Sequence, residues 1–284
     1  MTTTALATSL EAIVDRRPQQ LTALTGASTG TVMRADFADS TRLVVKTGAD
    51  NLALERRMLA DLARDSDVPL PGVVYGDDAI LVLEFLDHDP GIPGPAAQRH
   101  AGHLLAGLHQ VIRPAIGYPY DTVIGKLHQP NPTSERWLTF FAEQRLGHMV
   151  REGVREGTVS HELATRLDRL AGRLDRYLDE PDHPSLLHGD LWTGNLLHKG
   201  DRIVGLIDPA IYWGHPEIEL AYMTLFDTVT EDFFAAYCAL RPIDEGFFEL
   251  RRDIYNIYPL LVHVRYWDAA YSRPIDATLR RLGL

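Results

Sequence analysis

The segment LLHGDLWTGNLL, residues 186–197, places two side chains capable of proton and metal chemistry five positions apart. Asp190 is a carboxylate that could orient an acceptor hydroxyl and take its proton. Asn195 carries a neutral, hard carbonyl oxygen of the kind that binds Mg²⁺. A base and a metal ligand in one short loop indicate phosphoryl transfer, which needs little covalent chemistry from the protein. The alternative is a loop in which both side chains cap turns.

Asp208 is the candidate for a second metal ligand. It ends RIVGLID, residues 202–208, a strand-like run that is otherwise apolar after its first residue. A carboxylate at the buried end of a strand needs a partner or a metal ion. Protein kinases also place an asparagine five residues after the catalytic aspartate and a second metal-binding aspartate later in the chain. The alternative is an aspartate that starts a turn before Pro209.

Lys46 and Glu55 form the predicted cation site for the nucleotide phosphates. Lys46 lies at the end of the apolar strand RLVVK. On the helix predicted next, Leu52, Glu55 and Leu59 recur at helical spacing, so Glu55 falls on the buried stripe. A buried carboxylate needs a counter-charge, and Lys46 is the available one. An ion pair on the surface is the alternative.

A turn-rich stretch, LTGASTGTV at residues 24–32, precedes the lysine strand. Gly26, Ser28 and Gly30 are small residues that would let backbone N–H groups approach phosphate oxygens. The stretch matches neither a full G-x-G-x-x-G motif nor a P-loop lysine motif, so the prediction rests on its position before the lysine strand.

The strand LVLEFL, residues 81–86, ends just before a proline-rich stretch. In a kinase-like fold this is where the main chain meets adenine. We therefore expect Glu84, Phe85 and Leu86 to bind the nucleotide through their backbone.

The elements that must position these residues divide the chain into two lobes. We predict a strand-rich N-terminal lobe with a helix over residues 1–86, a linker at 87–95 (DHDPGIPGP) and a larger, mainly helical lobe over 96–284. The predicted helices are 9–17, 51–65, 96–112, 136–150 and 160–178, and the predicted strands are 31–37, 42–48, 72–76, 79–86, 185–188, 195–198 and 202–208.

Composition excludes several classes of protein. With 284 residues, 45% apolar and 24% charged, the chain is typical of a globular protein with a sizeable core. The formal charge of −11 argues against general nucleic-acid binding. Cys238 is the single cysteine, so no intramolecular disulfide can form, and no run approaches the length of a membrane span. We expect a cytoplasmic protein that binds neither nucleic acid nor membrane; the oligomeric state is open, and a monomer fits.

The sequence resembles the fructosamine-3-kinase (ketosamine-3-kinase) family, which belongs with the aminoglycoside phosphotransferase-like kinases. The likeness rests on LLHGDLWTGNLL and LIDPAIYWGHPEIELAYMTLF. It continues, in the order of the family, through VVKTG, LVLEFL, IGKLHQPN, WLTFFAEQRL and YPLLVHV, and so covers nearly the whole chain. The resemblance implies an α+β, bilobal, protein kinase-like fold.

The resemblance also implies a role for each site residue. Asp190 would be the base, Asn195 and Asp208 would hold Mg²⁺, Lys46 would contact the phosphates of ATP, and Glu55 would pair with Lys46.

The same resemblance implies that Trp192, His215 and Glu217 lie near a pocket for the sugar amine. Lobe packing is the alternative for Trp192, and a structural hydrogen bond is the alternative for the other two. His188 is expected to be structural, because Asp190 already fills the role of base. His263, in an apolar helix, is a core histidine or a substrate contact.

Two features depart from the family pattern. The glycine-containing loop has no cysteine, so no thiol-based regulation is expected there. Lys126 and Leu127 stand where smaller or more polar residues are expected, which leaves substrate contacts in that segment open.

The activity implied by the resemblance is transfer of the γ-phosphoryl group of ATP to the third-carbon hydroxyl of a ketosamine, a small molecule formed from a sugar and an amine. The nearest alternative is a kinase for an aminoglycoside or a choline-like compound. A protein kinase is disfavoured because the chain has no D-F-G or A-P-E string. A binding module without catalysis is disfavoured because every expected catalytic residue type is present.

Overall fold

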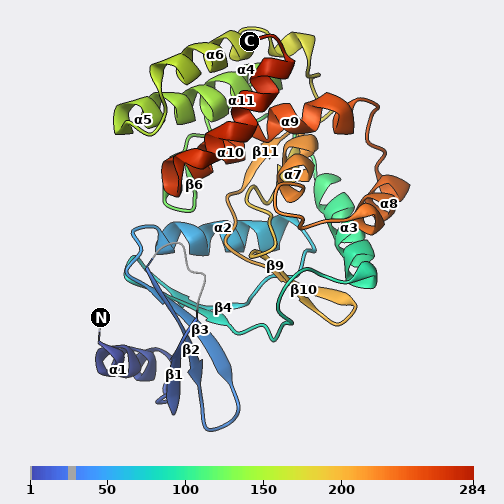
Figure 1. Ribbon diagram of the computed structural model, residues 1–284. Coiled ribbons are helices and arrows are strands. Elements are labelled where there is room, and N and C mark those ends of the chain that lie inside the picture. Colours follow the sequence, from blue (N-terminus) through green and yellow to red (C-terminus); the bar gives the residue numbers. More distant parts are fainter. Residues whose placement is uncertain (1, 25–29) are drawn as a thin grey trace.

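The computed structural model describes residues 2–24 and 30–284, and these form two lobes (Figure 1). The N-lobe holds one antiparallel sheet with the strand order β1-β2-β3-β5-β4. Its elements are α1 (Thr3–Val14), β1 (Gln20–Ala23), β2 (Thr31–Asp36), β3 (Arg42–Thr47), α2 (Leu52–Asp65), β4 (Val73–Gly76) and β5 (Ile80–Glu84).

Alternation along β3 decides which way Lys46 points. Leu43 and Val45 are buried in the cluster that α1 forms on one face of the sheet. Because successive strand residues point to opposite faces, Val44 and Lys46 lie on the other face. There Val44 packs with the apolar cluster that α2 contributes. The lysine therefore points toward α2 and the other lobe.

The C-lobe is mainly helical. Its helices are α3 (Pro95–His109), α4 (Trp137–Phe140), the π-helical turn η1 (Phe141–Gly147), α5 (His148–Glu156), α6 (His161–Ala171), η2 (Leu174–Arg176), α7 (Pro216–Met223), α8 (Glu231–Leu240), η3 (Phe247–Arg251), α9 (Arg252–Tyr255), α10 (Ile257–Tyr266), η4 (Ala269–Tyr271) and α11 (Ser272–Arg281). Its short strands pair as β6 (Thr122–Ile124) with β7 (Leu127–Gln129), β8 (Ser185–Leu187) with β11 (Tyr212–Gly214), and β9 (Leu196–Lys199) with β10 (Arg202–Leu206).

The main core lies in the C-lobe and reaches across the boundary. Met58 and Leu62 of α2 are buried in the same cluster as the residues of α3, α4 and α10. In Figure 1, α2 runs along the junction, between the sheet of the N-lobe and the C-lobe. The helix that carries Glu55 thus packs on both lobes.

The predicted fold class is confirmed: a small β-rich lobe with a helix is joined to a larger helical lobe. Most predicted elements are present with ends shifted by a few residues. Helix α1 begins earlier than predicted, because the Thr2 side chain caps it by accepting from the Ala5 amide. It ends at Val14, and the next residue, Asp15, lies in the left-handed region with φ 53°. The division at 86/87 and 95/96 stays a prediction.

Four strands, β1, β6, β7 and β11, were not predicted. Each is three or four residues long, too short for a periodic signal, and exists through pairing with a partner strand. Across residues 2–24 and 30–284, no helix combines the length and apolar character needed to cross a membrane.

Candidate functional site

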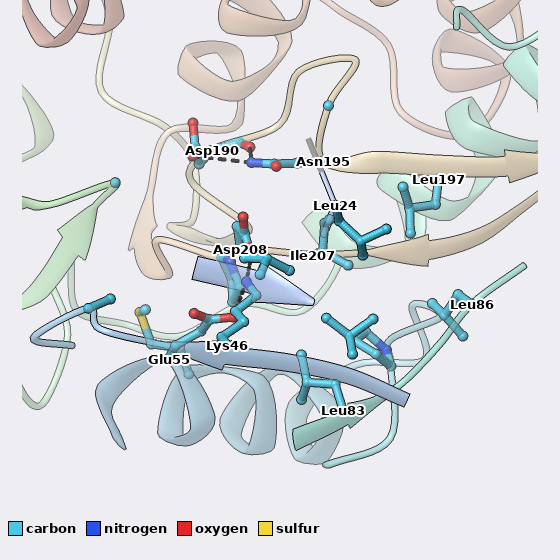
Figure 2. A pocket seen from close by; sticks show the side chains of 18 of the residues that line it. Leu24, Lys46, Glu55, Leu83, Leu86, Asp190, Asn195, Leu197, Ile207 and Asp208 are labelled. Carbon is cyan, nitrogen blue, oxygen red and sulfur yellow. Dashed lines mark hydrogen bonds and ion pairs between the residues drawn. The ribbon is translucent and has the colours of Figure 1, made fainter. Parts of the chain in front are cut away.

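A cavity of about 640 Å³ lies between the lobes, and Figure 2 shows it from close by. Asp190 and Asn195 lie at one wall, Lys46 and Glu55 at the opposite wall, and Asp208 between them. The predicted site residues that line the cavity are Lys46, Glu55, Glu84, Phe85, Leu86, Asp190, Trp192, Asn195 and Asp208. Stretches up to 162 residues apart therefore meet around one space large enough for a nucleotide and a small acceptor.

Lys46 is held between two carboxylates. Its Nζ donates to Glu55 Oε1 at 2.7 Å and also forms an ion pair with Asp208. The side chains of Lys46 and Glu55 are 14% and 11% exposed, whereas that of Asp208 is 42% exposed and faces the cavity. The predicted Lys46–Glu55 pair is thus present and buried, which excludes the surface alternative.

Burial and charge act against each other in this group. Burial raises the pKa of the Glu55 carboxyl above its ordinary value and the Asp208 carboxylate adds to the rise, although the Lys46 ammonium opposes it. Burial would lower the pKa of Lys46, but the Asp208 and Glu55 carboxylates outweigh it and raise that pKa above its ordinary value. Lys46 therefore stays a cation at neutral pH, which is the charge that a contact with phosphate oxygens would need.

Asp190 is oriented by two donors. The Tyr222 hydroxyl donates to Oδ1 at 2.9 Å, and Asn195 Nδ2 donates to Oδ2 at 3.2 Å and to the Asp190 carbonyl at 2.8 Å. Burial raises the pKa of the Asp190 carboxyl to about 7, the two hydrogen bonds work against this rise, and the nearby Asp208 carboxylate adds to it. A carboxyl with a pKa near neutrality is suited to accept a proton and return it.

Glu219 of α7 holds the backbone of the two residues that precede Asp190. Its Oε1 accepts from the Gly189 amide at 2.6 Å, and its Oε2 accepts from the His188 amide at 3.3 Å. Gly189 has φ 87°, and a Cβ there would lie 2.2 Å from the Ala210 carbonyl oxygen, so only glycine fits. His188 is fully buried, and its Nδ1 accepts from the Asp190 amide at 3.3 Å, in agreement with the structural role expected.

His109 completes this buried network. Its Nε2 lies 3.0 Å from Glu219 Oε2, and its Nδ1 lies 2.8 Å from the Tyr237 hydroxyl oxygen. Burial lowers the pKa of His109 below 6.5 and outweighs the Glu219 carboxylate. A neutral imidazole that donates to Glu219 and accepts from Tyr237 satisfies both contacts.

We expect His109 to make the protein less stable in acid. An unfolded histidine binds a proton near pH 6.5, whereas the folded imidazole stays neutral to lower pH, so stability falls as the pH falls through this window. One such proton corresponds to a slope of about 1.4 kcal/mol per pH unit. In His109→Gln, urea unfolding between about pH 6.5 and about pH 4.5 should show a shallower loss of free energy. An equal or steeper slope in the variant would contradict this assignment.

The two predicted metal ligands suit Mg²⁺. Because Asn195 uses its amide nitrogen to hold Asp190, its carbonyl oxygen is left to bind a cation, and Asp208 adds a carboxylate oxygen. Within the part of the chain that the structure describes, no group of three or more His, Cys, Asp or Glu could hold a metal ion alone. Mg²⁺ in kinase sites is held by one or two protein ligands together with nucleotide phosphates, and this donor set fits that pattern.

Asp208 has a backbone conformation that is unusual for its residue type. Its φ is 54°, in the left-handed region. Such a conformation costs about 1 kcal/mol or more in a non-glycine residue and tends to occur at functional sites. Here it follows the end of β10 and turns the carboxylate toward Lys46.

Glu84, Phe85 and Leu86 all line the cavity, beside apolar residues such as Leu83 and Leu197. The amide of Glu84 donates to the Gly72 carbonyl at 2.8 Å, and that of Phe85 donates to the Arg42 carbonyl at 3.2 Å. Among the described residues, no acceptor is found for the amide of Leu86. Of these three residues, Leu86 is therefore the one whose backbone N–H is free to donate to the edge of a nucleotide base.

The glycine-containing loop is described only in part. Gly26 and Ser28 lie outside the described residues. Gly30 has φ 65°, and a Cβ there would lie 2.3 Å from the Thr47 carbonyl oxygen at the end of the lysine strand. It is not among the residues that line the cavity.

The three residues expected near the sugar-amine pocket divide into two groups. Trp192 lines the cavity and is 37% exposed. His215 and Glu217 do not line it. Glu217 is bound by Arg251 through two hydrogen bonds of 2.7 and 2.8 Å, and His215 caps α7 by accepting from the Glu217 amide at 3.2 Å. This geometry favours the structural alternative for both.

Glu217→Gln is expected to lower stability rather than acceptor affinity. It leaves the guanidinium of Arg251, whose side chain is 11% exposed, without its counter-charge, which should cost about 3 kcal/mol of unfolding free energy. Urea unfolding and steady-state kinetics at a temperature where the variant is folded would measure both quantities. A large rise in the acceptor KM with normal stability would instead support the pocket role.

Several residues of the site were missed by the sequence analysis. Tyr222 is buried on α7 and points its hydroxyl at Asp190. Asn51, Gly125 and the 64% exposed Trp267 line the cavity from the position before α2, from the β6–β7 turn and from the end of α10. Nothing in the spacing of these four residues marks them, because they belong to four separate parts of the chain. His263 donates from Nδ1 to the Pro259 carbonyl at 2.7 Å and does not line the cavity, in keeping with the core alternative.

Comparison with known proteins gives the same fold and related activities. The profile of the fructosamine kinase family matches residues 38–283. A probable ketoamine kinase of Vibrio parahaemolyticus is 31% identical over 234 residues, which are 81% of this chain and 79% of the relative. The crystal structure of a candidate fructosamine-3-kinase from Thermobifida fusca matches with a TM-score of 0.88 at 30% identity, over 98% of each chain. An ADP-bound aminoglycoside phosphotransferase shares the fold at 14% identity, with a TM-score of 0.61 over 99% of this chain and 97% of that one.

The predicted resemblance and the predicted enzyme class are thereby confirmed. The protein is a phosphotransferase of the sugar-amine kinase type, with ATP as co-substrate and a small molecule as acceptor. With the profile covering most of the chain and the predicted kinase residues gathered around one cavity, this chain belongs to the fructosamine kinase family.

Proposed function

We propose that the enzyme transfers the γ-phosphoryl group of ATP to the third-carbon hydroxyl of a ketosamine of the fructosamine or ribulosamine type. The observation that supports this most directly is the shared cavity: the Asp190 carboxylate and the Lys46–Asp208 pair face the same space of about 640 Å³. A base and a phosphate-binding cation are thus within reach of one bound nucleotide and one acceptor.

In this proposal each side chain acts on a stated group. Lys46 contacts the phosphates and is held by Glu55, while the backbone N–H of Leu86 donates a hydrogen bond to the adenine edge. Asn195 and Asp208 would hold Mg²⁺, which when bound supplies positive charge against the phosphate oxygens. The acceptor oxygen attacks the γ-phosphorus, the bond to the ADP oxygen breaks, and the hydroxyl proton passes to Asp190.

The position of Asp190 in its loop favours this proton transfer. Its two oxygens are fixed by Tyr222 and Asn195, so the carboxylate does not need to reorient when the acceptor binds. A hydroxyl placed between Asp190 and the γ-phosphate would meet both reacting groups at once. Trp192, on the same loop and partly exposed, is positioned to cover one side of the sugar.

The product explains how such an enzyme could promote deglycation. Phosphate on the third carbon is a far better leaving group than hydroxide. After enolisation toward the first carbon it is eliminated, and the amine is then released without further action by the protein. The enzyme therefore needs only to select and activate one hydroxyl.

A panel of acceptors tests the proposal. With Mg²⁺ and ATP, the purified protein should form ADP in the presence of fructosyl-amines or ribulosyl-amines, and free amine should appear more slowly after phosphorylation. Aminoglycosides are the informative comparison, because an enzyme with this fold acts on them. Turnover on aminoglycosides alone would falsify the ketosamine assignment.

A further inference from the structure

The helix that carries Glu55 is anchored to the opposite lobe. Met58 and Leu62 of α2 are 1% and 0% exposed within the core cluster of the C-lobe. Asn51, directly before α2, donates from Nδ2 to the carbonyl of Gly125 in the β6–β7 turn at 3.2 Å. The helix is therefore tied to the C-lobe both at its start and along its length.

A third tie involves one partly buried carboxylate. Asp61 of α2 accepts at Oδ2 from the Tyr120 hydroxyl at 2.6 Å and from the Tyr118 hydroxyl at 3.2 Å. The Arg57 guanidinium, one helical turn earlier, lies 3.6 Å from the centre of the Tyr120 ring. The Asp61 side chain is 14% exposed, so these contacts are largely shielded from water. Hydrogen bonds to an ionised acceptor are about twice as strong as neutral ones.

These contacts are separate from the cavity. None of Arg57, Asp61, Tyr118 and Tyr120 lines it. Spacing of four residues places Arg57 and Asp61 on the same side of α2, one turn apart. The residues that touch the nucleotide space and the residues that fasten the helix are therefore different, although both sets lie on or against α2.

The consequence concerns Lys46. Its two partners are Asp208, in the C-lobe, and Glu55, on a helix fastened to the C-lobe. Lys46 itself comes from the N-lobe sheet. We propose that Arg57, Asp61 and Tyr120, here called the α2 clamp, are positioning residues that fix Glu55 and through it hold Lys46 against the nucleotide phosphates. The inference rests on the proposed function in one respect, namely that Lys46 binds those phosphates.

Removal of one hydroxyl tests the clamp. In Tyr120→Phe the Kd for Mg²⁺ with a non-hydrolysable ATP analogue, measured by calorimetry, should rise about tenfold, which corresponds to about 1.4 kcal/mol. Tyr75→Phe is the matched control, because Tyr75 also donates to an aspartate, Asp77 at 2.8 Å, but within the N-lobe and away from the cavity. The control should keep the wild-type Kd.

A double-mutant cycle separates positioning from general destabilisation. If the clamp acts through Glu55, then Tyr120→Phe in a Glu55→Gln background should change the Kd by less than about twofold. If Tyr120→Phe does not fold, the same measurements can be made on Asp61→Asn. That variant keeps the shape of the side chain and weakens both phenolic hydrogen bonds.

Two results would overturn the clamp. One is a wild-type Kd in folded Tyr120→Phe or Asp61→Asn. The other is an equal weakening of binding with and without Glu55. A wild-type protein that binds no nucleotide is a different outcome, because it contradicts the proposed function itself and not the clamp.

Discussion

Asp190→Asn should lower kcat by about 10³-fold, within the range for loss of a positioned general base. The amide has the size of the carboxyl and can still accept from the Tyr222 hydroxyl, so the loop should keep its shape. What is lost is the group that we propose takes the proton of the acceptor. Initial rates of ADP formation with a saturating ketosamine would measure the effect.

Nucleotide binding serves as the control for this variant. Asp190 contacts neither Lys46 nor Glu55, so the Kd for Mg²⁺ and ATP should stay within about twofold of the wild-type value, a change of less than about 0.5 kcal/mol. Full activity in Asp190→Asn would remove the residue from its role as base. Loss of nucleotide binding together with activity would instead indicate a change in the structure of the loop.

Asp208→Asn is expected to have the second largest effect, a fall in kcat of about 10²-fold, as for other groups that offset charge on transferring phosphates. The substitution removes a carboxylate that we propose as a Mg²⁺ ligand and leaves the weaker amide oxygen. The apparent affinity for Mg²⁺ should fall as well, so part of the activity should return at high Mg²⁺ concentration. Titration of the initial rate with Mg²⁺ at fixed ATP would show both effects.

A surface aspartate provides the comparison for Asp208. Asp87 also forms an ion pair with a lysine, Lys199, but both side chains are about half exposed and lie outside the cavity lining. Asp87→Asn should leave kcat and the Mg²⁺ dependence unchanged, because exposed ion pairs contribute little. A Mg²⁺ dependence in Asp208→Asn identical to that of the wild type would remove Asp208 from the metal site.

The parts of the site that could be predicted from the sequence are those encoded within short windows. Alternation in β3 places Lys46 opposite the core face, and the helical phase of α2 places Glu55 among buried residues. The pattern in residues 186–197 specifies a strand, a tight turn at Gly189 and a second strand, so Asp190 and Asn195 meet in one loop. In each case the interacting positions are separated by fewer than about ten residues, and local periodicity is sufficient.

The parts that could not be predicted depend on pairs far apart in the chain. Tyr222 reaches Asp190 from a helix 32 residues later, and Tyr120 reaches Asp61 from 59 residues later. Neither tyrosine differs, in its sequence surroundings, from one that packs in a core. His215 and Glu217 are the opposite case. The resemblance implies that they lie near a substrate pocket, yet Glu217 binds Arg251 and His215 caps the start of α7.

By itself, the sequence determined the chemical groups of this protein and their local geometry: a lysine strand, a glutamate helix, and a loop with an aspartate and an asparagine, in the order of a kinase. Only the tertiary structure decided which of those groups share a cavity, and which residues fasten α2 to the C-lobe. The physical reason is that backbone conformation follows from neighbours in the chain, whereas burial and pairing between distant segments follow from how the whole core packs.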